Sequence, residues 1–111
     1  NRPKPEKAAY AHAPRVLGVD VARHGDDESV ILKRQGPICE VPKRLRIPDT
    51  MALAAEVIDV IEQWRPDAVF VDATGMGWGV IDRLRQVGYG RLVYGVQTGE
   101  SAVDAKRYRN H

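Results

Sequence analysis

The stretch RVLGVDVARHGDDESVIL, Arg15 to Leu32, decides the fold. It is an apolar run that ends in a carboxylate, Asp20, followed by the polar loop ARHGDDE and a second apolar run, SVILKRQ. Two apolar runs joined by a short polar loop are typical of a β-hairpin. The stretch therefore predicts two antiparallel strands, over 16–20 and 29–35, with a negative charge where the first strand ends.

Composition limits the kinds of protein that the chain can be. The chain has 111 residues, of which 43% are hydrophobic, enough for one folded domain with a small core. Its 17 basic and 15 acidic residues leave a net charge of +2, which does not by itself indicate a polyanionic partner. The single cysteine, Cys39, excludes an internal disulfide and a cysteine-only zinc site and suits a cytoplasmic location. No apolar run approaches the roughly 18 residues of a membrane span.

Two regions differ in pattern. Residues 1–14 contain three prolines and no periodicity, so we expect a linker or flexible arm there and a single domain over 15–111. The chain begins without an initiator methionine and stops at KRYRNH without a closing element. This is the pattern expected of a piece of a longer protein.

The remaining elements alternate between strands and helices. ICEVPKRLRI, residues 38–47, predicts a third strand, and Pro42 favours a sheet edge because it has no N–H to donate. Apolar spacing predicts helices near 49–65, capped by Asp49 or Thr50, and near 77–87. AVFVD, residues 68–72, and RLVYGVQTG, residues 91–99, predict two further strands. The expected order is βββαβαβ.

This order predicts an α/β fold with a mixed five-stranded sheet. The expected strand order is 3-2-1-4-5, with only strand 2 antiparallel to the others. Parallel crossovers are right-handed in about 98% of cases, so both helices should lie mainly on one face. The other face would have only the amino-terminal arm or the tail to cover it. We therefore expect self-association through that face, or the arm folded across it.

Two carboxylates end strands that are predicted to be neighbours. Asp20 and Asp72 should leave the sheet side by side at its carboxyl edge, where open α/β sheets place their sites. Two close carboxylates repel unless a cation lies between them, and Mg²⁺ prefers carboxylate oxygens. Either aspartate alone could simply cap a turn, but the pair favours a metal site. Asp27, in the acidic cluster DDE, is a candidate third ligand; otherwise it belongs to a solvated loop.

Several other residues have a structural and a functional interpretation. His24 is expected to be a loop residue rather than a ligand, and Trp78 to pack in the core rather than stack on a base. The glycines of TGMGWG favour a tight backbone turn beside Asp72 over a phosphate-binding loop. The tail KRYRNH is expected to be solvated. Candidate DNA contacts are His24, Lys106, Arg107 and Arg109.

The segments GVDVARHGDDESVILKRQG, VFVDATGMGWGVIDRLRQVGY and GVQTGESAVDAKRYRN resemble the nuclease domain of large terminase subunits from tailed bacteriophages and prophages. The resemblance covers about residues 15–110. It implies a ribonuclease H-like fold and a hydrolase that cuts concatemeric DNA during genome packaging with Mg²⁺ or Mn²⁺, at a two-ion site. It also implies the cytoplasm of a bacterial host, with double-stranded DNA, a packaging ATPase domain, the small terminase subunit and the portal as partners.

On this resemblance Asp20 corresponds to the first catalytic acid and Asp72 to the second, with Asp27 at an acidic position of the first hairpin. The family carries a third acid on a later helix, beyond the region similar to KRYRN, and this chain stops before it. No GKS or GKT motif of an ATPase occurs. The implied metal site is therefore incomplete within this chain.

Two alternatives stay open beside the endonuclease. A phosphate-binding domain of the actin and sugar-kinase type also opens with a strand, an aspartate and a glycine-bearing hairpin, but the second domain and second phosphate loop are missing. A non-catalytic remnant or interaction module would keep the fold without a complete site. Metal-dependent DNA cleavage, nucleotide binding, or neither would separate the three.

Overall fold

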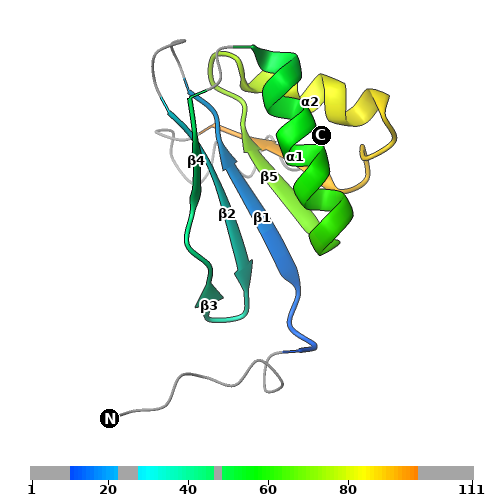
Figure 1. Ribbon diagram of the computed structural model, residues 1–111. Helices are drawn as coiled ribbons and strands as arrows, with labels where there is room; N and C mark the ends of the chain where they lie inside the picture. The colour runs from blue at the N-terminus through cyan, green and yellow to red at the C-terminus, as the bar shows by residue number, and fades with distance from the viewer. Residues whose placement is uncertain (1–10, 23–27, 47–48, 98–111) are drawn as a thin grey trace.

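The chain folds into one mixed sheet with two helices, seen in a computed structural model that describes residues 11–22, 28–46 and 49–97 (Figure 1). The elements, in chain order, are β1 (Arg15–Asp20), β2 (Ser29–Gln35), β3 (Ile38–Cys39), β4 (Lys43–Leu45), α1 (Thr50–Trp64), β5 (Ala68–Asp72), α2 (Gly77–Gln86) and β6 (Val93–Val96). The α/β class and both helices were predicted from the sequence, and each helix boundary lies within one residue of its expected position.

The sheet has the order β3-β2-β1-β5-β6, and β4 also pairs with β2. β1, β5 and β6 are mutually parallel, and β2 is antiparallel to β1, β3 and β4. The antiparallel hairpin and the parallel β1–β5 pair are the two features that bring Asp20 and Asp72 to the same edge. Within the described ranges, neither helix is long and apolar enough to cross a membrane.

The edge of the sheet differs from the prediction. The single third strand expected over 38–47 is two short strands, β3 and β4, which pair with opposite ends of β2. The ladder is interrupted at Val41, which is 91% exposed, and at Pro42. Proline has no N–H for the ladder, so it divides the strand instead of only placing it at an edge. The last strand, expected over 91–99, is also shorter, at Val93–Val96.

Helix α1 has well-defined ends. Asp49 is its N-cap, with a side-chain oxygen that accepts a hydrogen bond of 3.1 Å from the amide of Met51. At the other end Arg65 takes a left-handed conformation, φ 57°, and Pro66 follows, so the helix cannot continue. The chain is thereby turned into β5.

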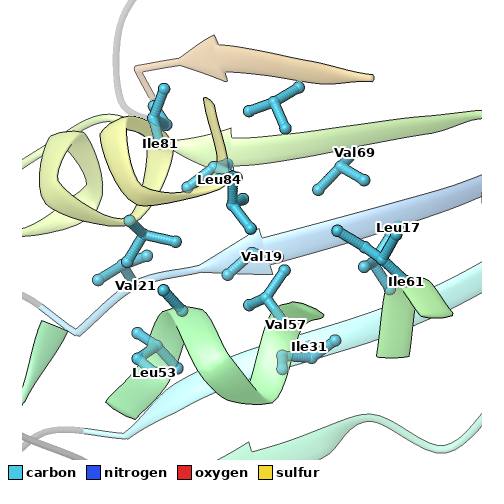
Figure 2. Close-up of a cluster of buried hydrophobic side chains, with 14 of the residues drawn as sticks. Leu17, Val19, Val21, Ile31, Leu53, Val57, Ile61, Val69, Ile81 and Leu84 are labelled. Atoms are coloured by element: carbon cyan, nitrogen blue, oxygen red, sulfur yellow. The ribbon is translucent and has the colours of Figure 1, made fainter. Parts of the chain in front are cut away.

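Both helices pack on the same face of the sheet (Figures 1 and 2). Alternate strand residues such as Leu17, Val19, Val69 and Val71 are buried against them. The helices contribute the other half of this single cluster, with Leu53, Ala54, Val57, Val60 and Ile61 from α1 and Val80, Ile81 and Leu84 from α2. The strand residues between the buried ones therefore point to the opposite face, on which the described residues place no helix.

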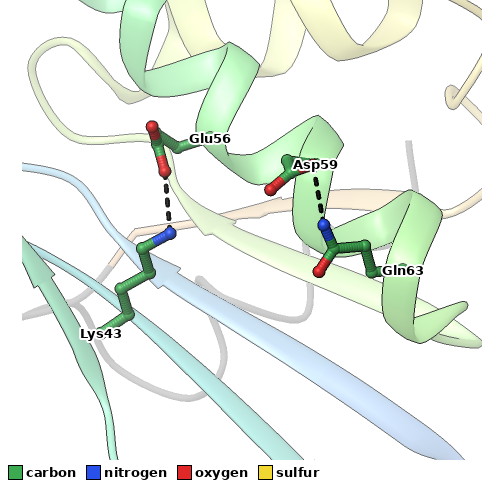
Figure 3. A network of polar contacts seen from close by, with 4 residues as sticks. All are labelled: Lys43, Glu56, Asp59 and Gln63. Carbon is green, nitrogen blue, oxygen red and sulfur yellow. Dashed lines mark hydrogen bonds and ion pairs between the residues drawn. The ribbon is translucent and has the colours of Figure 1, made fainter.

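On the edge strand β4, the side chain of Lys43 faces the helices. The ammonium of Lys43 lies 2.8 Å from Oε1 of Glu56 on α1. Figure 3 draws this bond beside the hydrogen bond that Gln63 donates to Asp59. An exposed pair of this kind contributes about 0–1 kcal/mol at most, so its importance is geometric. Because Lys43 points toward α1, its neighbour Arg44 points to the opposite face.

Candidate metal-binding site

Asp20 and Asp72 lie side by side. In the parallel pair β1–β5, Val19 is in register with Val71, and the next residues along both strands are these two aspartates. Val19 and Val71 are buried under the helices, so the two aspartates point to the opposite face. Neighbouring strands are about 4.8 Å apart, so the two aspartates extend from adjacent positions on the sheet.

Both aspartates line one hollow of about 500 Å³ on that face. The other residues that line it come from five strands, and most are apolar: Gly18, Val19, Val30, Leu32, Arg44, Phe70 and Val96. Among the lining residues that the structure describes, Arg44 is the one basic side chain. It lies at the edge-strand end of the row Arg44–Val30–Asp20 in the sheet. Its described lining thus combines an apolar floor with the carboxylates of Asp20 and Asp72 and the guanidinium of Arg44.

The two carboxylates differ in environment. Asp72 is 3% exposed, and its Oδ1 accepts a hydrogen bond of 2.9 Å from the amide of Thr74. Asp20 is exposed. Asp72 therefore caps the turn that follows β5, which is one of the two roles considered from the sequence. Accepting this bond does not by itself prevent metal binding, because a carboxylate offers about four acceptor positions.

The turn after Asp72 depends on its glycines, as the sequence predicted. Gly75 has φ 63°, a conformation that residues with a side chain rarely adopt. A Cβ atom on Gly77 would overlap the main-chain carbonyl of Asp72. Helix α2 can therefore begin directly against the end of β5 only because residue 77 has no side chain. The same contact fixes the backbone that carries the Asp72 carboxylate.

Ser29 holds the other end of the site in place. Its side chain is fully buried, and its Oγ accepts a hydrogen bond of 2.8 Å from the amide of Ala22, two residues beyond Asp20. The bond ties the continuation of β1 to the start of β2, on the two sides of the hairpin loop.

We expect Ser29→Ala to destabilise the fold by about 1–3 kcal/mol, because the buried amide of Ala22 would lose its acceptor. The measurement is urea unfolding followed by circular dichroism. A midpoint equal to that of the unchanged protein would show that this bond does not anchor the loop.

The outcome for the other predicted residues is mixed. Asp27, His24, Lys106, Arg107 and Arg109 all lie outside the described residues. Trp78, expected in the core, is instead 41% exposed in the first turn of α2, and the edge of its ring lies near Gly95.

Arg44 was missed, since only the register of β4 shows that it faces the hollow. Within the described ranges, no group of three or more His, Cys, Asp or Glu side chains is arranged to hold a metal ion.

The pair Asp20 and Asp72 fits a hard divalent cation. Two acidic oxygen donors on adjacent rigid strands are the donor type that Mg²⁺ and Mn²⁺ prefer, and such sites complete the shell with water or substrate phosphate. An apolar floor lowers the local dielectric and strengthens the attraction between the carboxylates and a cation. No protein-family model matches the chain, and no curated protein matches it.

Proposed function

We propose that this chain is the metal-dependent endonuclease domain of a phage or prophage terminase large subunit, with a ribonuclease H-like fold. It would cleave concatemeric double-stranded DNA during genome packaging, in the cytoplasm of a bacterial host. The proposal rests on the sequence resemblance and on one structural observation. The observation is the pair Asp20 and Asp72, on the same face at the ends of adjacent parallel strands.

The residues of the site have separate roles in this proposal. Asp20 and Asp72 would hold Mg²⁺ or Mn²⁺, and Asp27 is the proposed additional ligand. When bound, such ions polarise a phosphate oxygen and lower the pKa of a bound water. Arg44, whose side chain is 61% exposed on the rim of the same hollow, would donate to a phosphate of the DNA backbone.

A complete nuclease would need more than this chain in the proposed scheme. The third acid on a later helix, the packaging ATPase domain, the small subunit and the portal would come from the parent protein and its assembly. We therefore expect low or absent cleavage from the 111-residue chain alone and metal-dependent cleavage from the protein encoded by the full coding sequence.

The experiment is cleavage of linear duplex DNA by that full-length protein, with Mg²⁺, with Mn²⁺ and with EDTA. The proposal expects double-strand cuts with either metal and none with EDTA. Saturable ATP binding to the 111-residue chain, without cleavage by the full-length protein, would instead support a phosphate-binding domain of the actin and sugar-kinase type. Neither activity, in a protein that remains folded, would support a non-catalytic module of the same fold.

A further inference from the structure

One ion pair lies at the rim of the hollow, between the start of β2 and the edge strand β4. Nη1 of Arg44 is 3.9 Å from Oε1 of Glu28, the residue that precedes β2. Arg44 is in register with Val30 and Leu45 with Ser29, so Glu28 lies diagonally across from Arg44. Ser29 is buried on the core side, and its neighbour Glu28 therefore points to the same face as Arg44. The guanidinium that faces the hollow thus already has an acidic partner.

The pair is loose and exposed to water. Its separation of 3.9 Å exceeds the roughly 2.7–2.9 Å of a charge-assisted hydrogen bond. The side chain of Arg44 is 61% exposed and that of Glu28 is 46% exposed. An exposed pair of this kind shifts an equilibrium by about fivefold at most. A phosphate group, which a guanidinium can bind through two parallel hydrogen bonds, is therefore able to replace the Glu28 carboxylate.

The basic side chains on this face lie on the side of the edge strand. Lys33 lies over the ring of Trp64 on the helix side, so Arg34, the next residue of β2, points to the opposite face together with Arg44. The described strands β1, β5 and β6 place no arginine or lysine on that face. A phosphate backbone at the hollow would therefore meet its cations on β2 and β4.

Glu28 is not a ligand of the candidate metal site in the part of the chain that the structure describes. It does not line the hollow that Asp20 and Asp72 share, and it forms no group of three metal-binding side chains with them. Its negative charge instead lies beside the basic rim. A carboxylate in this place disfavours a phosphate backbone in two ways, by direct repulsion and by occupying Arg44.

We infer that Glu28 competes with DNA for Arg44. The inference rests on the proposed function, because the competing anion is the DNA backbone of that proposal. When DNA binds, the Arg44 guanidinium leaves the carboxylate of Glu28 and donates to a phosphate, and no covalent bond changes. Glu28 thereby lowers the affinity of the chain for DNA, and the two members of one ion pair have opposite effects on binding.

The test is binding of a fluorescent DNA duplex of about 20 base pairs to the 111-residue chain in EDTA, measured by anisotropy between about 20 and 200 mM salt. Arg44→Gln should weaken binding about threefold and make the dependence of log K on log salt less steep by about 0.9, the value for one phosphate contact. Glu28→Gln should strengthen binding about two- to fivefold, because Arg44 is then released from its partner.

The pair of Lys33 with Glu40 is the matched control. Its separation is 3.4 Å, its side chains are 36% and 47% exposed, and it lies on the helix side beside Trp64. Glu40→Gln removes the same charge as Glu28→Gln and should have a clearly smaller effect, since salt screens charges more than about 10 Å away. Circular dichroism shows that each variant is folded.

Two double variants separate a contact from net charge. Glu28→Gln with Arg44→Gln leaves the net charge unchanged, and it should still weaken binding and reduce the salt dependence as Arg44→Gln does. Lys33→Gln with Glu40→Gln also leaves the net charge unchanged, and it should alter neither quantity.

Three results would overturn the inference. They are a Glu28→Gln variant that binds DNA no more tightly than the unchanged chain, an equal response of the two ion pairs, and no binding by the unchanged chain up to about 1 mM. Cleavage by the full-length protein together with any of these would remove the inference and leave the nuclease function standing. The expected binding pattern without cleavage would instead remove the nuclease function and leave the competition between Glu28 and DNA.

Discussion

Replacing Asp20 or Asp72 with asparagine should, under the proposed nuclease function, reduce Mg²⁺-dependent DNA cleavage by the protein encoded by the full coding sequence at least about 100-fold, because the bound metal is expected to supply several kcal/mol of transition-state stabilisation. Asparagine keeps the size of the side chain and removes the negative charge that holds the cation. The hydrogen bond from the amide of Thr74 can still be accepted by the carbonyl oxygen of an asparagine at position 72. The fold should therefore survive while the activity is lost.

The measurement is the rate of cleavage of linear DNA at saturating Mg²⁺, with circular dichroism to show that each variant is folded. Asp82→Asn is the matched control, since Asp82 is exposed on α2 and does not line the hollow. It should cut at the normal rate. Full activity in Asp72→Asn would remove the role assigned to that carboxylate, even if Asp20→Asn were inactive.

The second large effect is expected at Gly77, a residue without a side chain. We expect Gly77→Val to destabilise the fold by at least about 3 kcal/mol, because its Cβ would overlap the main-chain carbonyl of Asp72. A main-chain atom at the end of a core strand cannot move away as a flexible side chain can. Either α2 must shift or the end of β5 must move, and both change the position of the Asp72 carboxylate.

Urea unfolding measures this effect directly, and any folded fraction can be tested for metal binding. Gly90→Ala is the control, because its Cβ would make only an ordinary contact of 3.6 Å with the Arg85 side chain. That substitution should change the stability by less than about 0.5 kcal/mol. An unfolding midpoint for Gly77→Val near that of the unchanged protein would show that the turn tolerates a side chain.

The apolar runs and the helix spacing were enough to predict most of this fold. The two buried runs that end in an aspartate predicted that β1 and β5 are parallel neighbours. This pairing in turn predicted that Asp20 and Asp72 are adjacent. The rule that parallel crossovers are right-handed predicted that both helices lie on one face of the sheet. The prediction was less accurate at the edge, because Pro42 was treated as compatible with one continuous strand. In the structure it separates β3 from β4.

Other features of the site could not be predicted, because they depend on register and close approach. Arg44 lies among alternating basic residues, and only its pairing with Val30 shows that it faces the hollow while Lys43 faces α1. The space that the described residues leave over Gly18 is likewise a property of packing, since the sequence shows only a glycine inside an apolar run. The exposed position of Trp78 was not predicted either, although α2 begins where the sequence indicated.

The most direct test of the metal site is titration of the isotopically labelled 111-residue chain with Mn²⁺, followed by the loss of amide signals in NMR spectra. Bound at Asp20 and Asp72, the paramagnetic ion should first remove the signals of the residues around 20–22 and 72–74. The double variant Asp20→Asn with Asp72→Asn should lose this selective effect while keeping its folded spectrum. Signals lost first elsewhere in the chain, or lost equally in the double variant, would contradict the assignment of these two carboxylates as metal ligands.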